Sequence, residues 1–233
     1  MTQSKQFWNE KYAEQEDLWG LRPEQTLVTY EKLIPENGKI LDLGIGEGRN
    51  SIYFASKGWS VDGVDIADTA VDRCRQMANQ TGFDIHASIG DLRDFHIQPE
   101  SYSLIIMANI LNFFHDDEIN AILKKVKAGL IEGGLAYIQA FDIHDPSFSK
   151  RLHLLDEKFN NTLYNPKTDS YMHYFTVDEL QESFMGYKTI KCSQSIQMDL
   201  GHGEPHHHGL IELLVQKNKD TELGKEELNV QRS

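Results

Sequence analysis

The chain has 233 residues, 39% of them hydrophobic, which is enough to bury the core of a single α/β domain. Acidic residues outnumber lysine and arginine 36 to 23, for a formal net charge of −13, so a nucleic-acid partner is disfavoured. No apolar run approaches the roughly 20 residues of a membrane span, and the N-terminus has no apolar signal core, so we expect a cytoplasmic protein without a membrane partner.

The first 35 residues precede the core of the predicted domain. Phe7 to Tyr12 opens an amphipathic, aromatic segment, and a short helix follows Pro23 until Pro35 stops it. Arg22 lies just before this helix. It is as compatible with a solvated surface position as with a ligand contact.

A glycine-rich turn follows the first buried strand. The apolar run Ile40 to Leu43 leads directly into glycines at positions 44, 46 and 48, and a helix is predicted from Arg49 to Gly58. Without a Cβ atom the backbone can turn at positive φ and a ligand can lie against the main chain. Strand, glycine turn and helix together predict a nucleotide or nucleoside site.

The spacing of the glycines narrows the choice of ligand class. The dinucleotide fingerprint requires glycine at its sixth position, where this chain has Arg49. The P-loop requires lysine directly after its last glycine, where the same arginine stands. Arg49 therefore weakens both the dinucleotide-binding and the P-loop interpretations. The hypothesis of a nicotinamide oxidoreductase, which needs the dinucleotide fingerprint, is weakened with the first.

Later strands end in polar side chains. The strand Trp59 to Asp65 ends in an acid about 20 residues after the glycine turn, where a ribose-binding carboxylate is expected. A third strand is predicted to end at Asp91, a fourth runs from Tyr102 to Asn109, and a fifth from Leu135 to Phe141. Ligands of open α/β sheets bind beyond these carboxyl ends. A helix from Asp116 is predicted to end at the glycines 133 and 134.

The pattern Asp42-x-Gly44-x-Gly46-x-Gly48 resembles motif I of the class I S-adenosylmethionine-dependent methyltransferases. Residues 46–50 and 64–66, with the aromatic opening, are also similar to the tellurite-resistance methyltransferase family. The resemblance covers the first two thirds of the chain and departs at Ile45, where that family usually has cysteine. It implies S-adenosylmethionine as cofactor and an α/β, Rossmann-like, doubly wound seven-stranded sheet, mostly parallel with an antiparallel C-terminal strand.

We expect one methyltransferase domain over residues 1–217 and a polar tail over 218–233. Within the domain, residues 1–35 are expected to form a helical lid and residues 145–176 a substrate-side insertion of helix and loop. Two strands, Tyr187 to Asp199 and His208 to Gln216, are predicted to form the antiparallel end of the sheet.

The resemblance, taken with the strand ends, assigns site residues. The predicted cofactor-binding residues are Arg22, Asp42, Gly44, Gly46, Gly48, Asn50, Asp65, Ile66, Asp91, Leu92 and Asn109. The predicted substrate residues are Trp19, Asn112, Phe113, His144, His173 and His202.

Methyl transfer from a sulfonium is an in-line displacement that mainly needs alignment and exclusion of water. For a protic acceptor, His115, His206 and His208 are the predicted proton acceptors, although His115 also fits a helix start with no chemical role. Alternation along a strand lets His206 and His208 share a ligand, but the spacing matches no zinc motif and we predict no metal.

Two functional classes remain open. The first is a methyltransferase acting on a small molecule, such as a chalcogen oxyanion or a thiol. The second is a non-catalytic module that binds S-adenosylmethionine, since cofactor motifs alone do not prove turnover. The oligomeric state cannot be predicted from the sequence.

Overall fold

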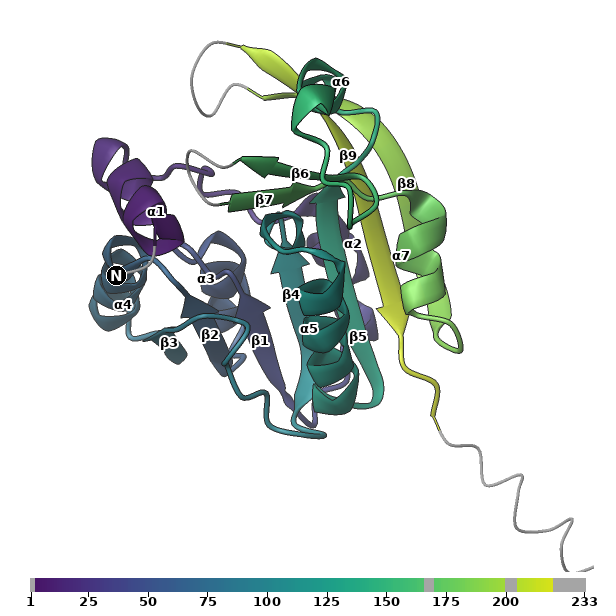
Figure 1. Cartoon of the computed structure of the whole chain (residues 1–233). Coiled ribbons are helices and arrows are strands. Elements are labelled where there is room, and N and C mark those ends of the chain that lie inside the picture. Colours follow the sequence, from purple (N-terminus) through teal and green to yellow (C-terminus); the bar gives the residue numbers. More distant parts are fainter. Residues whose placement is uncertain (1–2, 166–169, 200–204, 220–233) are drawn as a thin grey trace, which may run out of the picture.

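The computed structural model describes residues 3–165, 170–199 and 205–219. Its centre is a seven-stranded sheet of order β3-β2-β1-β4-β5-β9-β8 (Figure 1). The strands are β1 (Lys39–Leu43), β2 (Val61–Asp65), β3 (Ile85–Ile89), β4 (Tyr102–Ala108), β5 (Leu130–Phe141), β8 (Lys188–Asp199) and β9 (His206–Gln216). The helices are α1 (Gln3–Glu14), α2 (Gln25–Tyr30), α3 (Arg49–Ser56), α4 (Asp68–Thr81), α5 (Asp116–Gly129), α6 (Pro146–Lys150) and α7 (Val177–Ser183).

The pairing of the strands confirms the predicted sheet. β1 to β5 pair in parallel, and β9 runs antiparallel to both β5 and β8. The central strands are apolar on both faces because helices cover both sides. Side chains of α5 and α7 pack in one apolar cluster, and those of α2, α3 and α4 in a second.

Several predicted boundaries differ from the structure, most clearly the end of the helix that begins at Asp116 and the end of the third strand. Helix α5 ends at Gly129 and β5 begins at once, so the glycines 133 and 134 lie inside a strand. A Cβ at Gly134 would meet the carbonyl oxygen of Ile131 at 2.9 Å, and the register with β4 shifts at this point. The glycines therefore mark an irregularity in a strand rather than a helix end. The third strand ends at Ile89, two residues before Asp91.

The insertion over residues 145–176 contains strands that the sequence pattern did not indicate. β6 (Thr162–Asn165) and β7 (Ser170–His173) form a separate antiparallel pair. It follows α6 and the single turn η3 (Leu152–Leu154) and contacts η2 (Leu111–Phe113), the turn after β4. Figure 1 shows this pair at the carboxyl end of the parallel strands.

Helix α1 packs on α4 at the same end of the sheet (Figure 1). The backbone N–H of Thr69 donates to Asn9 Oδ1 over 3.0 Å, and Lys5 pairs with Asp68 at 2.7 Å. These contacts hold α1 beside the glycine turn. Within the described ranges, none of the helices has the length and hydropathy needed to cross a membrane.

Candidate functional site

The turn after β1 has the backbone geometry that its glycines allow. Gly44, Gly46 and Gly48 have φ of +76°, +53° and +90°, and Gly48 immediately precedes α3. Asp42 is buried at the end of β1 and accepts a hydrogen bond from Ser51 Oγ over 2.7 Å. Burial raises the pKa of this carboxyl group from 3.8 to about 6.

Asp65 ties the end of β2 to the glycine turn. Its Oδ2 accepts the N–H of Gly46 and its Oδ1 the N–H of Ala67, each over 2.9 Å. Burial raises the pKa of Asp65, although these backbone donors act in the opposite direction. Each carboxylate oxygen has a second lone pair, so the group can accept further hydrogen bonds from a ligand.

A first cavity lies over the turn. Its wall combines the turn with residues of α1, the following loop and the end of β4: Trp8, Tyr12, Trp19, Gly20, Asp42, Gly44, Ile45, Gly46, Glu47, Gly48, Arg49, Asn50, Asp65, Ile66, Ala108, Asn109, Ile110 and Phe113. Asn109 has a left-handed backbone at φ +57°, and its buried Oδ1 has no hydrogen-bond partner in the described part of the chain. An unpartnered acceptor in this wall fits a ligand that donates a hydrogen bond.

Aromatic rings cover this cavity from the N-terminal side. The rings of Trp8 and Phe113 meet edge to face with centroids 4.9 Å apart. Trp19 Nε1 donates to Tyr12 Oη over 3.2 Å. Glu47 accepts the N–H of Leu18 and pairs with Arg73, both within 2.9 Å, so the loop after α1 is fastened to the turn and to α4.

Arg22, predicted as a cofactor contact, is exposed and is not among the residues of the cavity wall. The arginine in the wall is Arg49, which pairs with Glu24 and donates to the carbonyl of Arg22. Asn50 also lies in the wall, with its Oδ1 accepting the N–H of Glu24. Sequence reasoning missed Arg49 as a cavity residue, although its position directly after Gly48 was a usable signal.

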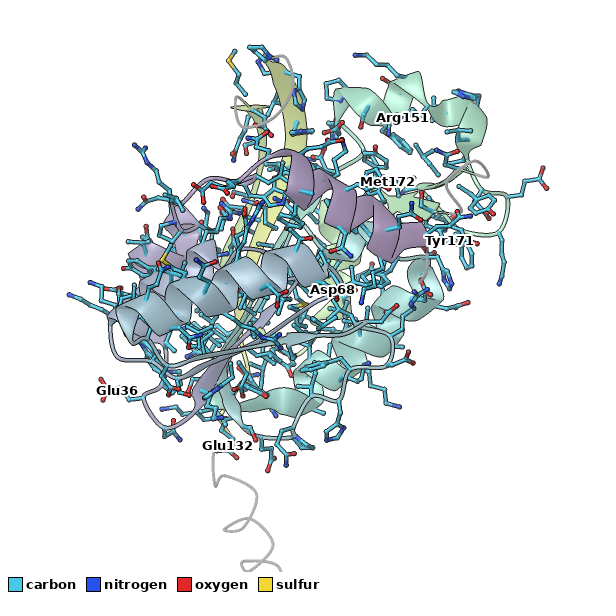
Figure 2. The ribbon with its side chains drawn as sticks, turned by 90° about the vertical axis from the view of Figure 1, so that its left-hand side faces the viewer. Glu36, Asp68, Glu132, Arg151, Tyr171 and Met172 are labelled. Atoms are coloured by element: carbon cyan, nitrogen blue, oxygen red, sulfur yellow. The ribbon has the colours of Figure 1, made fainter. Side chains whose placement is uncertain are left out.

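A second cavity, of about 690 Å³, adjoins the first. It shares Trp8, Gly44, Asp65, Ile66, Ile110 and Phe113 with the first wall. It adds the predicted residues Asp91 and Leu92 and extends between α1 and the β6–β7 pair to Tyr171, Met172 and Arg151. Figure 2 shows Tyr171 and Met172 beside α1. The volume lies within the range of small-molecule sites.

Asp91 is hydrogen-bonded to Arg93, two residues further along the chain. Arg93 Nε donates to Asp91 Oδ1 over 2.9 Å. Partial burial acts to raise the pKa of Asp91, but the hydrogen bonds from Arg93 outweigh it and hold the pKa below its ordinary value. The carboxylate at this wall therefore stays ionised and can accept a hydrogen bond.

Two predicted substrate residues are structural. Asn112 is fully buried: its Nδ2 donates to the carbonyls of Phe141 and His173, and its Oδ1 accepts the N–H of Phe141. His173 is 1% exposed, between Thr162 Oγ1 at 2.8 Å and Glu179 Oε1 at 2.9 Å. The hydrogen bonds of both side chains go to the β6–β7 pair and its surroundings, and neither residue is among those that line the first cavity.

The other predicted histidines of the described ranges lie outside both cavity walls. His115 stacks on Phe159 with centroids 4.4 Å apart, which agrees with a packed helix-start residue. His144 is exposed, with Nδ1 2.9 Å from Gln194 Nε2. His206 and His208 face each other at the start of β9. His202 lies outside the described residues.

His208 has a buried acidic partner in Asp145, with His208 Nδ1 and Asp145 Oδ2 2.8 Å apart. Partial burial acts to raise the pKa of Asp145, but the hydrogen bonds with His208 and Ser147 together outweigh it and keep the pKa below its ordinary value. Asp199, His206 and His208 together could hold a metal ion.

The strand order, the glycine turn and the carboxylate at the end of β2 are those of the class I methyltransferase fold. Residues 40–134 match a family model described as a methyltransferase domain. The "Probable S-adenosyl-L-methionine-dependent methyltransferase TehB" of Haemophilus influenzae is 28% identical over 102 residues, 44% of this chain and 35% of that protein. The carboxy-S-adenosyl-L-methionine synthase of Pasteurella multocida is 26% identical over 138 residues, 57% of this chain and 52% of that protein.

Among solved structures, one similar chain is the 1,6-didemethyltoxoflavin-N1-methyltransferase of Burkholderia thailandensis, with bound 1,6-didemethyltoxoflavin and S-adenosylhomocysteine. It superposes with a TM-score of 0.69 at 16% identity and covers 93% of this chain and 88% of that one. This chain spans only about a third and about half of the two curated relatives. The matches confirm the resemblance to class I methyltransferases, a class whose cofactor is S-adenosylmethionine.

Proposed function

We propose that this protein is an S-adenosylmethionine-dependent methyltransferase that methylates a small molecule carrying a soft nucleophile, such as a chalcogen oxyanion or a thiolate. The observation that carries the proposal is the junction of the two cavities. One contains the glycine turn and Asp65, the other extends past Asp91 to the β6–β7 pair, and they meet at Trp8 and Phe113.

The residues of the two walls fit the cofactor. Asp65 would accept hydrogen bonds from the two ribose hydroxyls, and Asp91 one from the adenine amino group. Asn109 Oδ1, which lacks a partner in the described structure, would accept from the amino group of the methionine part. When bound, the cofactor supplies a methyl group on a positively charged sulfur.

The aromatic rings suit that charge. Trp8, Trp19 and Phe113 all line the first cavity, and aromatic faces attract cations. Packed around the ligand, these rings also exclude water from the path of an in-line displacement. We propose that residues 1–35 act as the lid that supplies the two tryptophans, and that the insertion 145–176 contributes to the acceptor side.

The nature of the acceptor follows from the groups in the walls. Neither of the two described walls contains a histidine. An acceptor that arrives ionised, as a thiolate or an oxyanion, needs no proton acceptor from the protein. The second cavity contributes Arg151 as a cation and aromatic rings from Phe7 and Tyr171, so it suits an acceptor with an anionic group and an apolar body.

The first test is calorimetric titration with S-adenosylmethionine, S-adenosylhomocysteine and NAD. We expect the two adenosyl ligands to bind, NAD not to bind, and Asp65→Ala to weaken adenosyl binding by about 100-fold, because about two charge-assisted hydrogen bonds are lost. Asp62→Ala is the matched control, since Asp62 lies on the same strand outside both walls. Binding of NAD instead, or equal losses in both variants, contradicts the proposed site.

The second test separates an enzyme from a binding module. Formation of S-adenosylhomocysteine is measured with tellurite, selenite and small thiols as acceptors. Turnover above the acceptor-free rate, lost in Asp65→Ala, is expected of the enzyme. Tight cofactor binding with no turnover on any of these acceptors favours the non-catalytic module.

A further inference from the structure

Three side chains with metal-binding atoms converge where β8 and β9 meet. His206 and His208 stand two positions apart on β9, so both point to one face of the sheet, and their Nε2 atoms are 2.9 Å apart. Asp199 lies opposite His206 in the strand register, and its Oδ2 is 3.7 Å from His208 Nε2. One ligand atom from each residue falls within 4.8 Å of the others.

A buried carboxylate fixes the orientation of one of these imidazoles. Asp145 is 2% exposed and its Oδ2 lies 2.8 Å from His208 Nδ1. The same oxygen accepts the N–H of Gly209 over 3.1 Å, and the other accepts the N–H of Ser147 over 2.7 Å. An ionised Asp145 makes Nδ1 the protonated nitrogen of His208 and leaves Nε2 with the lone pair that a metal requires.

The backbone of β9 beside the cluster allows the loop before α6 to approach closely. A Cβ on Gly209 would lie 2.3 Å from Asp142 Oδ1 and 2.5 Å from the N atom of Asp145. Only glycine lets the loop before α6 press against β9 at this point. Asp145 and His208 are therefore held in place from both sides.

We propose that Asp199, His206 and His208 bind one divalent transition-metal ion of the zinc type, with Asp145 as the positioning residue behind His208. Two imidazoles and a carboxylate are ligands that suit zinc. Tetrahedral coordination with bonds of about 2.0–2.1 Å places neighbouring ligand atoms about 3.3 Å apart. The two distances from His208 Nε2, 2.9 and 3.7 Å, lie on either side of that value.

The cluster is separate from the proposed methyl-transfer site, because none of its residues lines either described cavity. An ion there would join β8 to β9 and, through Asp145, to the loop before α6. The sequence spacing alone predicts no metal, since Asp145 is remote in the chain from the histidine pair and Asp199, seven residues before His206 (206 minus 199), forms no known zinc motif with it.

The proposal is tested by calorimetric titration with zinc chloride. The protein used is the full chain, treated with a chelator and free of any polyhistidine tag. We expect one ion per chain. We also expect the visible absorption of tetrahedral cobalt when cobalt chloride replaces zinc. His206→Ala and His208→Ala should each weaken zinc binding by at least 100-fold, and the nearly isosteric Asp199→Asn by at least 10-fold.

His207→Ala is the matched control, because His207 is exposed and, by strand alternation, points to the opposite face. Asp145→Asn should lower zinc affinity 10- to 100-fold while the cobalt spectrum at saturation keeps its shape, as expected of a positioning residue. S-adenosylhomocysteine binding, unchanged in all variants, verifies the fold. Absence of one-to-one zinc binding, undiminished binding in the His206 and His208 variants, or an equal loss in His207→Ala overturns the proposal.

Discussion

Gly46→Ala tests whether the lid is closed over the glycine turn by direct contact. A Cβ at this position would lie 2.7 Å from Tyr12 Oη. Reaching an ordinary contact of 3.4 Å requires a shift of 0.7 Å (3.4 minus 2.7), and Tyr12 is buried between Trp8 and Trp19. The backbone at Gly46 is also left-handed, with φ +53°.

The cost of the contact with Tyr12 and the cost of the left-handed backbone can be separated by the same substitution at a second glycine. Gly82→Ala imposes a similar left-handed backbone, φ +69°, but no atom lies within 4 Å of its Cβ. The left-handed backbone costs alanine about 1–2 kcal/mol in either variant, and overpacking at Tyr12 adds about 1–3 kcal/mol for Gly46→Ala alone. We expect Gly82→Ala to lose about 1–2 kcal/mol of unfolding free energy and Gly46→Ala about 2–5.

Guanidinium chloride unfolding measures these losses, and calorimetry measures S-adenosylhomocysteine binding, which we expect Gly46→Ala to weaken at least 10-fold. Tyr12→Phe removes the clashing hydroxyl, so the loss on adding Gly46→Ala to Tyr12→Phe should fall to that of Gly82→Ala. The reasoning is refuted if Gly46→Ala unfolds at the same midpoint as Gly82→Ala, or if Tyr12→Phe brings no relief.

Three further predictions concern the core of the site. Because burial raises the folded pKa of Asp42 to about 6, the native state holds a proton that the unfolded chain releases above pH 4, and stability falls as pH rises through this window. The unfolding free energy of Asp42→Asn relative to wild type should therefore increase from pH 4 to pH 7, by up to about 3 kcal/mol, and a difference independent of pH would contradict this. Asn112→Ala loses three buried hydrogen bonds and should cost about 3 kcal/mol in denaturant unfolding, with S-adenosylhomocysteine affinity within about twofold of wild type. A loss of affinity without a loss of stability would show that the Asn112 side chain faces the ligand rather than the core. Trp8→Ala should raise the dissociation constant for S-adenosylhomocysteine about 10-fold in calorimetry with a small change in melting temperature, and an unchanged constant would mean that α1 does not cover the ligand in solution.

The fold and the glycine turn could be predicted from the sequence because their signals are local. The run that ends at Leu43 and the run that ends at Asp65 are single strands read in order along the chain, and the glycines between them require the positive φ that the structure has. Parallel strands bring their carboxyl ends to one edge, so residues on separate strands could be assigned to one site without coordinates.

Other features depended on contacts between distant parts of the chain. Asn112 and His173 have the residue types of a polar site, but their partners, Phe141 and Glu179 among them, come from other elements and take up their hydrogen bonds inside the core. Composition cannot distinguish a satisfied buried amide from one that faces a ligand.

The cluster at the start of β9 shows the same division. The sequence by itself determined that His206 and His208 share a face, because strand alternation is a property of consecutive residues. Only the tertiary structure brought Asp145 and Asp199 to them, since strand register and loop packing depend on the whole sheet. Arg49 is a further case: its place in the motif was visible, but its inclusion in the cavity wall and its pairing with Glu24 were decided by the way the N-terminal segment folds back over the turn.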